Sequence, residues 1–161
     1  MLNAANTITR TAASQMDPSA AVLAMLKKGE ALKLTRYRLG DGGWTIGYGR
    51  FYPDSGVAVC PETITRDQAE DFFVQDVEQR AAKWVRAYVT ADLAQHEFDA
   101  LVHMAYNLSP KSFKTIAAEV NAGNDPEFAA MRFVAAGTAN ERGVRNRRAR
   151  EIALYRSGTY A

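Results

Sequence analysis

The sequence of 161 residues contains one cysteine, five prolines and no long hydrophobic run. A single cysteine, Cys60, excludes an intramolecular disulfide, and since no basic residue lies close to it in the sequence, we expect a thiol without a chemical role. No stretch approaches the roughly 20 apolar residues of a membrane-spanning helix, so we expect no membrane insertion. The first residues lack a basic start, an apolar core and a good cleavage site, and we therefore expect no signal peptide.

The composition is that of one ordinary globular domain, with 47% hydrophobic and 24% charged residues. The charges are unevenly distributed. Residues 54–79 contain seven acidic residues and one arginine, whereas residues 141–156 contain six arginines and two glutamates. The acidic stretch is typical of a solvated helix face, and the basic stretch suits an anionic polymer, either nucleic acid or bacterial cell wall. Charge alone does not choose between these two.

Apolar residues at helical spacing predict most of the secondary structure. Asp17 and Pro18 are typical of a helix start. A capping box at residues 65–68 opens a long helix of about twenty residues, with no break in its apolar spacing. Residues 90–92 are expected to cap the next helix. Shorter helices are predicted at residues 113–121, 125–135 and 144–155.

The stretch after the first helix combines a carboxylate with a predicted β-hairpin. Glu30 lies at the exit of that helix, and two arms follow at residues 35–38 and 44–49, the second rich in β-forming residues. The turn at residues 40–43 holds three glycines around Asp41, which supply the positive φ angles of a tight hairpin. A carboxylate that faces a glycine-rich ribbon predicts a cleft lined by Glu30.

Segments along the whole chain carry a resemblance to a known family. They are Glu30-x-Leu32-x-Leu34-x-x-Tyr37, Thr45-Ile46-Gly47-Tyr48-Gly49, Phe98-Asp99-Ala100-Leu101-Val102, and Gly143-Val144 followed by Arg147-Arg148. The first two resemble the active-site segment of the phage-type lysozymes, the endolysin muramidases of glycoside hydrolase family 24, and the others are similar to later segments of that family. The resemblance covers roughly residues 18–160.

The resemblance implies an α+β, mainly helical, lysozyme-like fold of two lobes. A small β-hairpin lobe at about residues 30–64 and a larger helical lobe at about residues 80–161 are joined by the long helix. We expect a single lysozyme-like domain over residues 17–161, preceded by an N-terminal arm of residues 1–16.

Cleaving a glycosidic bond requires an acid that protonates the leaving oxygen and a carboxylate or a held water opposite it. Glu30 is the expected acid, because partial burial at a helix exit raises the pKa of a carboxyl group. In the resembled family an arginine of the last helix lies against this glutamate. Arg147 matches that arginine, with Arg148 as the alternative.

The second catalytic carboxylate of the family should lie at position 39, which is Leu39. Three hypotheses follow. Asp41 takes over the role from within the turn; Thr45, which matches the family's catalytic threonine, holds the attacking water; or the site is inactive and binds glycan. The family has a histidine after the second glycine, where this chain has Arg50. Whether Arg50 makes the stabilising pair that this histidine makes in the family is left open.

Sugar contacts are expected from Asn107, which matches a family position near the cleft, and from the rings of Tyr48 and Phe113. His96 and His103 lie seven residues apart on one predicted helix. No carboxylate or cysteine accompanies them at ligand spacing, so we expect no metal site and no cofactor.

The resemblance implies an endolysin that hydrolyses, with inversion, the β-1,4 bond between N-acetylmuramic acid and N-acetylglucosamine in peptidoglycan. The alternative, motivated by Leu39, is a peptidoglycan-binding module of the same fold with impaired catalysis. Nucleic-acid binding is a third hypothesis, but no groove-reading motif accompanies the basic helix, and the acidic helix opposes it.

We expect a monomer that acts on peptidoglycan glycan strands. In the absence of an export segment, two routes to the wall are open. The protein accumulates in the host cytoplasm and reaches the periplasm and cell wall through a separate pore-forming holin, or it travels in the virion.

Overall fold

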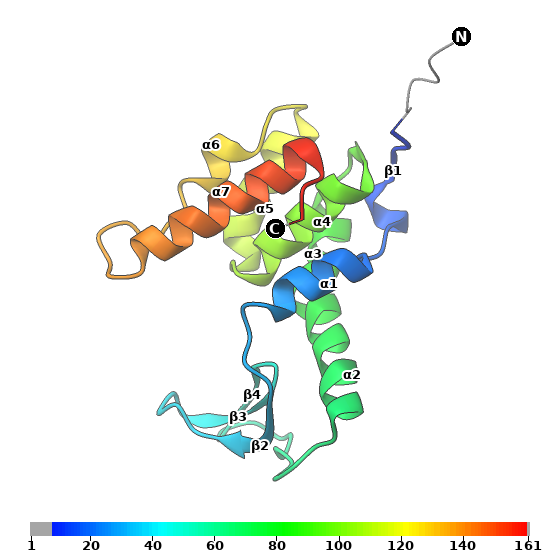
Figure 1. Ribbon diagram of the computed structural model, residues 1–161. Helices are drawn as coiled ribbons and strands as arrows, with labels where there is room; N and C mark the ends of the chain where they lie inside the picture. Colours follow the sequence, from blue (N-terminus) through cyan, green and yellow to red (C-terminus); the bar gives the residue numbers. More distant parts are fainter. Residues whose placement is uncertain (1–7, 161) are drawn as a thin grey trace.

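Two lobes make up the computed structural model, which describes residues 8–160 (Figure 1). In Figure 1 a three-stranded sheet lies apart from a larger group of helices, and α2 (Arg66–Val77) runs alongside the sheet toward that group. The sheet is antiparallel, with its strands in the order β2 (Lys33–Tyr37), β3 (Gly43–Gly47) and β4 (Arg50–Pro53). The predicted α+β, mainly helical fold is confirmed.

The β lobe has the predicted hairpin turn and a small core of its own. Gly40 and Gly42 in the turn adopt φ angles of 82° and 81°, which residues with a Cβ rarely adopt. Ile46 of β3 is fully buried and packs with Ile64 and Ala69. Since Ala69 belongs to α2, the sheet is held against that helix by apolar contacts.

The predicted hairpin ends at residue 49, but the structure adds a third strand, β4, directly after it. Thr45 of β3 pairs with Phe51, and Ile46 pairs with Arg50. β4 spans only four residues, none of them buried. Its sequence, Arg-Phe-Tyr-Pro, also lacks the alternation of apolar and polar residues by which a strand is recognised.

The predicted long helix is present over residues 66–88 but changes its hydrogen-bond pattern in the middle. It begins with the predicted capping box: the Thr65 hydroxyl accepts the Gln68 N–H at 3.1 Å, and the Gln68 side chain accepts the Thr65 N–H at 2.9 Å. After α2, a π-helical turn spans Glu78–Ala82, and α3 (Lys83–Tyr88) completes the helix.

The π-helical turn keeps one face of this helix buried over its whole length. Buried residues recur at every fourth position, at Ala69, Phe73, Val77, Ala81 and Val85. In a regular α-helix each such step advances about 40° around the axis, so the stripe would turn out of the core. The wider π turn rotates the stripe back toward the core.

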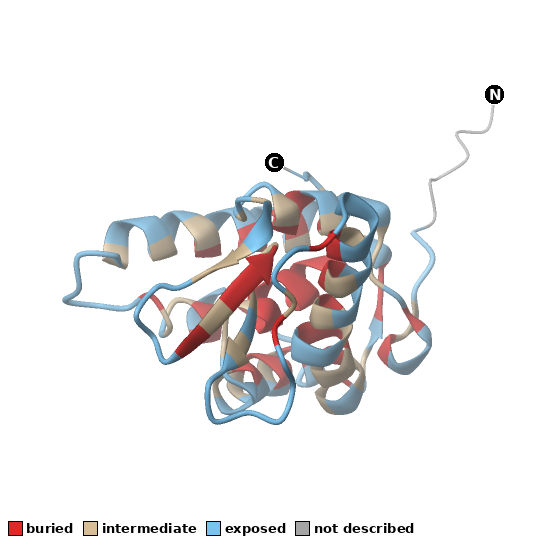
Figure 2. Cartoon of the chain, turned by 90° about the horizontal axis from the view of Figure 1, so that it is seen from below, coloured by how far each residue is buried: buried red, intermediate tan, exposed pale blue. Residues whose placement is uncertain are grey.

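α4 (Gln95–Tyr106) is the central helix of the larger lobe. All of its residues from 97 to 106 are buried, and α7 (Glu141–Ser157) packs along it. Figure 2 shows buried positions, in red, inside the molecule and exposed ones, in pale blue, on its outer turns and loops. The other helices of this lobe are α1 (Ala20–Lys27), α5 (Pro110–Asn121) and α6 (Glu127–Ala130). Across residues 8–160 we find no helix with the length and apolar character that crossing a membrane requires.

The segment before α1 packs against the helical lobe. Thr11–Ala12 form β1, which pairs antiparallel with β5 (Asp92–Leu93). Ala13 and Met16 are buried. The described part of the predicted N-terminal arm is thus attached to the domain, and residues 1–7 lie outside the described residues.

Two helices start later than the sequence predicts. α4 begins after Ala94, whose N–H donates to Glu97 Oε2 at 2.8 Å, and Asp92, the last of the three residues predicted as its cap, belongs to β5 instead. α1 begins after Ser19, whose hydroxyl accepts the Val22 N–H at 3.2 Å, two residues beyond the predicted cap at Asp17. In both cases local sequence signals the region of the start but not the residue.

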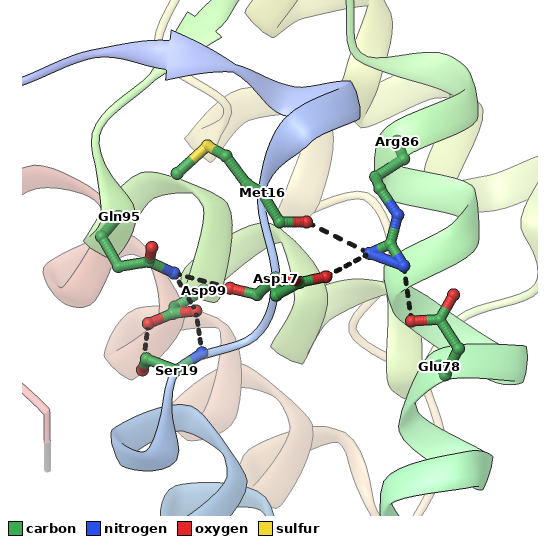
Figure 3. Close-up of polar contacts among 7 residues, drawn as sticks. All are labelled: Met16, Asp17, Ser19, Glu78, Arg86, Gln95 and Asp99. Atoms are coloured by element: carbon green, nitrogen blue, oxygen red, sulfur yellow. Dashed lines mark hydrogen bonds and ion pairs between the residues drawn. The ribbon is translucent and has the colours of Figure 1, made fainter.

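The start of α1 is held to α4 by the buried carboxylate of Asp99. This carboxylate accepts the Ser19 N–H at 3.1 Å, the Ser19 hydroxyl at 2.5 Å, the Gln95 amide at 3.0 Å and the Tyr160 hydroxyl at 2.5 Å. Figure 3 shows Ser19 and Gln95 converging on Asp99, beside Arg86, which contacts the segment before α1. These bonds fix the position of α1 and of the residues that follow it.

Replacing Asp99 by Asn should destabilise the protein. The asparagine amide cannot accept all four hydrogen bonds, and its NH₂ group would face partners that are themselves donors. We therefore expect a loss of about 2–3 kcal/mol in the free energy of unfolding. Urea unfolding followed by circular dichroism measures the loss. The exposed Asp71→Asn on α2 is the control and should change this free energy by less than about 0.5 kcal/mol. Equal stabilities of the two variants would contradict the anchoring role of Asp99.

Candidate active site

Glu30 lies just beyond the end of α1, at the junction of the two lobes. The last turn of α1 positions it, because the Gly29 N–H donates to the Leu26 carbonyl at 3.2 Å and the Glu30 N–H donates to the Lys27 carbonyl at 3.0 Å. The side chain is half-buried and lines a pocket between α1, α4 and α7. The other side chains of this pocket that bear on its chemistry are those of His103, Tyr106, Asn107, Arg147 and Arg150.

The Glu30 carboxyl lies against the backbone of the β lobe. Gly49, in the tight connection between β3 and β4, has a φ of 93°, and a methyl group placed on it would lie 3.2 Å from Glu30 Oε2. A side chain at this position would crowd the carboxyl, whereas glycine lets the two groups approach. The structure therefore brings Glu30 and the glycine-rich ribbon together.

The surroundings of Glu30 act on its pKa in opposite directions. Burial of the carboxyl raises its pKa, because the charged form is poorly solvated there. The positive charges of Arg80 and Arg147 lower it, and the effect of burial is the larger. Glu30 therefore retains its proton to a higher pH than an ordinary glutamate, as a general acid must.

Arg147 and Asn107 meet beside Glu30. The Arg147 guanidinium donates from Nη1 to Asn107 Oδ1 at 2.9 Å, which joins α7 to the end of α4. The Asn107 amide in turn donates to the carbonyl of His103 at 3.1 Å. This network holds a positive charge next to the carboxyl, in the place proposed for Arg147 from the sequence.

Arg148 does not fit the alternative Glu30-orienting role. Its side chain is 1% exposed, and it binds the carboxylate of Glu151 and the carbonyl of Phe133. Glu151 Oε1 also lies 2.7 Å from His103 Nδ1. Sequence reasoning missed this buried cluster, although the spacing of three residues between Arg148 and Glu151 on one helix is a signal for it.

The two aromatic residues expected to contact sugar are placed elsewhere. Phe113 is fully buried in the core of the helical lobe, which does not fit a sugar contact. It belongs to an apolar stripe of α5 with Ile116 and Ala117, three and four residues later, and that spacing favours the core. Tyr48 is half-buried; its hydroxyl donates to Glu70 at 2.6 Å and its ring packs on Phe73, so it joins the two lobes.

Thr45 and Asp41 differ in their surroundings. Thr45 is 4% exposed, and its cross-strand partner Phe51 lies on the same face of the sheet. The Phe51 ring also covers the neighbouring Gly43, where an added methyl group would lie 2.6 Å from it. Asp41 is exposed in the hairpin turn. The pocket that contains Glu30 is lined by none of Thr45, Asp41 and Leu39.

Arg50 forms an ion pair in the position of the family histidine. Its Nε donates to Asp76 Oδ1 at 3.0 Å, and its guanidinium lies 4.4 Å from the centre of the Phe72 ring. Both partners belong to α2. This ion pair ties the end of the ribbon to the helix that joins the lobes.

The side chains of residues 8–160 contain no group of three or more His, Cys, Asp or Glu that is arranged to hold a metal ion. His103 is engaged with Glu151, and His96 lies against Gly158 at the end of α7. The two histidines of α4 therefore have separate surroundings.

An acid with a raised pKa at the junction of a β lobe and a helical lobe is the arrangement of a lysozyme-like glycoside hydrolase. The family model of phage lysozyme matches residues 27–151. The chain belongs to the phage lysozyme family.

Three relatives show how far the similarity extends. The endolysin of Bacillus phage PZA is 35% identical over 151 residues, covering 89% of this chain but 57% of the relative. The endolysin of Acyrthosiphon pisum secondary endosymbiont phage 1 is 29% identical over 144 residues, covering 84% of this chain and 94% of the relative. The solved endolysin from Escherichia coli O157:H7 phage FAHEc1 superposes with a TM-score of 0.76 at 31% identity, covering 91% of this chain and 98% of that one. The chain thus spans little more than half of the first relative and nearly all of the other two.

Glu30→Gln should gain stability relative to the wild type as the pH rises. The folded protein keeps the Glu30 proton to a higher pH than the unfolded chain does, because burial raises the folded-state pKa. The stability of the wild type therefore falls as the pH rises from the unfolded to the folded pKa, whereas the variant, which mimics the protonated acid, loses nothing there. Urea midpoints measured from about pH 3 to about pH 7 report this difference.

The control is Glu62→Gln, whose native side chain is 82% exposed. It should show no gain that grows between the two ends of this pH range. A Glu30→Gln variant whose stability falls relative to the wild type as the pH rises would show that the Glu30 pKa is lowered in the folded protein, against the account given above.

Proposed function

We propose that this protein is an endolysin that hydrolyses the β-1,4 bond between N-acetylmuramic acid and N-acetylglucosamine in peptidoglycan. The observation that carries the proposal is the half-buried Glu30 carboxyl, which has a raised pKa and lies against Gly49 at the junction of the lobes. A carboxyl in this state donates its proton to a glycosidic oxygen. Membership of the phage lysozyme family supports the same reaction.

The charges around Glu30 suit both halves of a proton transfer. Before the reaction, burial favours the protonated form of the carboxyl. Once the proton has moved to the leaving oxygen and the bond to the sugar carbon has broken, Glu30 carries a negative charge. Arg147 and Arg80 then stabilise that charge, since their effect is to favour the carboxylate. A water attacks the sugar carbon from the opposite face and releases its proton to the surrounding solvent, which gives the inverted product.

We assign the holding of this water to Thr45. The ribbon runs from the turn around Asp41 through β3, and Gly49 beyond its end contacts Glu30. Thr45 therefore lies nearer to Glu30 along the ribbon than Asp41 does, by four residues or roughly 13 Å of extended chain. Because the two catalytic groups of an inverting enzyme are about 6.5–9.5 Å apart, Thr45 suits this spacing better than the turn does.

Phe51 and Asn107 are the proposed sugar contacts. Phe51 is the cross-strand partner of Thr45 and is 43% exposed, so its ring presents an apolar face to a pyranose beside Thr45. Asn107 offers a side-chain amide whose orientation is fixed by Arg147. Tyr48 and Phe113 are left out of the proposed site because of the contacts described above.

We also propose that the protein works as a monomer on glycan strands of the wall. It would reach them from the host cytoplasm through a separate holin, or as part of the virion. The competing function is a wall-binding module with impaired catalysis, which Leu39 motivates because the family has a carboxylate at that position.

Glu30→Gln should abolish wall hydrolysis while leaving wall binding intact. The amide keeps the shape of the side chain but has no proton of suitable acidity, and we expect the release of reducing sugar ends from purified peptidoglycan to fall by about 10²–10⁴-fold. The control Glu62→Gln should keep the wild-type rate. Wild-type protein that binds walls and releases no reducing ends would favour the binding module, and full turnover by Glu30→Gln would exclude Glu30 as the acid.

Thr45→Ala and Asp41→Asn should separate the two hypotheses for the attacking water. If Thr45 holds the water, Thr45→Ala should lower the rate at which permeabilised Gram-negative cells lose turbidity by about 100-fold, whereas Asp41→Asn should change it by less than about threefold. The opposite order would assign the role to Asp41 in the turn. Unfolding midpoints of both variants provide the control for misfolding.

A further inference from the structure

Arg80 occupies the middle of the π-helical turn between α2 and α3. This turn, Glu78–Ala82, buries Ala81 and Ala82 while leaving Arg80 exposed. π-Helical turns inside α-helices occur frequently at functional sites, and they interrupt the regular pattern of α-helical hydrogen bonds. Here the displaced segment lies in the helix that joins the two lobes.

The Arg80 guanidinium is held in place without being neutralised. It lies 4.4 Å from the centre of the Tyr106 ring, and its Nη1 donates to the Tyr106 hydroxyl at 3.3 Å. Among residues 8–160, no carboxylate lies within ion-pair distance of Arg80. Arg50, which lines a hollow together with Arg80, is by contrast paired with Asp76.

Two hollows meet at Arg80. The one on the helical lobe is lined also by Trp84 and Asn107, and the one on the β lobe is lined also by Gly49 and Phe51. Gly49 contacts the proposed acid, and Asn107 lines the pocket of that acid. Arg80 therefore stands in the groove where a glycan bound across the two lobes would pass.

Arg80 also acts on the proposed acid. Its positive charge lowers the pKa of Glu30, against the effect of burial. A guanidinium fixed by stacking, with free donors, is the side chain best suited to bind a carboxylate in two-point fashion.

We propose that Arg80 is a specificity-determining residue that binds a carboxylate of the peptidoglycan strand. The inference rests on the proposed function, and it adds that the protein prefers carboxylate-bearing glycan to neutral glycan. Two carboxylate sources exist in such a strand. One is the lactyl group of N-acetylmuramic acid where no peptide is attached, and the other is the acidic residues of the attached peptide.

Binding is measured in the Glu30→Gln background, so that the ligands are not consumed. Isothermal titration calorimetry compares Arg80→Gln with Arg80 intact on three ligands: peptide-bearing glycan fragments, the same fragments freed of peptide, and N-acetylglucosamine oligomers. Arg142→Gln, which removes an equally exposed arginine from α7, is the matched control for net charge. Urea midpoints check that each variant folds.

Arg80→Gln should raise the dissociation constant for carboxylate-bearing fragments by about ten-fold and leave that for the neutral oligomers unchanged. An effect on peptide-bearing fragments alone assigns the carboxylate to the peptide. An effect on the fragments freed of peptide alone assigns it to the lactyl group, whose carboxyl is free only there, and an effect on both shows that Arg80 binds either carboxylate. The same loss on all three ligands, or on none, would overturn the proposal. Absence of hydrolysis by the wild type would refute the proposed function but leave this binding comparison valid.

Discussion

The carboxyl of Glu30 is placed where burial and positive charge oppose one another. It follows α1, whose start is fixed by the Asp99 carboxylate, and it meets the ribbon at Gly49. Burial raises its pKa while Arg80 and Arg147 lower it. The other parts of the candidate site supply the groups that act on this pKa. The β lobe supplies the covering backbone, α7 supplies Arg147, and the helix joining the lobes supplies Arg80.

The contacts between the lobes preserve this arrangement. Arg50 binds Asp76, and Tyr48 donates to Glu70. The ribbon is therefore attached to α2 through the residues immediately before and after Gly49. A small core at Ile46 adds an apolar contact with the same helix. Because these bonds join the ribbon to the helix and the helix continues into the larger lobe, movement of the sheet relative to Glu30 is opposed by several independent interactions.

Much of this could be predicted from the sequence, for different reasons. Hydrophobic periodicity predicts the long helix, and the glycines around Asp41 predict the hairpin turn, because both features depend on residues close in sequence. Resemblance supplied Arg147 and Asn107, which are far apart in sequence and meet beside Glu30. The sequence did not reveal β4, which has no buried residue, or the π turn that exposes Arg80. The aromatic character of Phe113 suggests a sugar contact, but the apolar stripe of α5 to which it belongs favours a place in the core.

The most direct test of the central claim is the pKa of Glu30 itself. A ¹³C NMR titration of protein labelled at the glutamate side-chain carboxyl carbon reports it, with the Glu30 signal assigned by its loss in Glu30→Gln. The account predicts a midpoint above the value of about 4.3 that an exposed glutamate shows. A Glu30 midpoint at or below about 4.3 would contradict the claim that burial outweighs the two arginines.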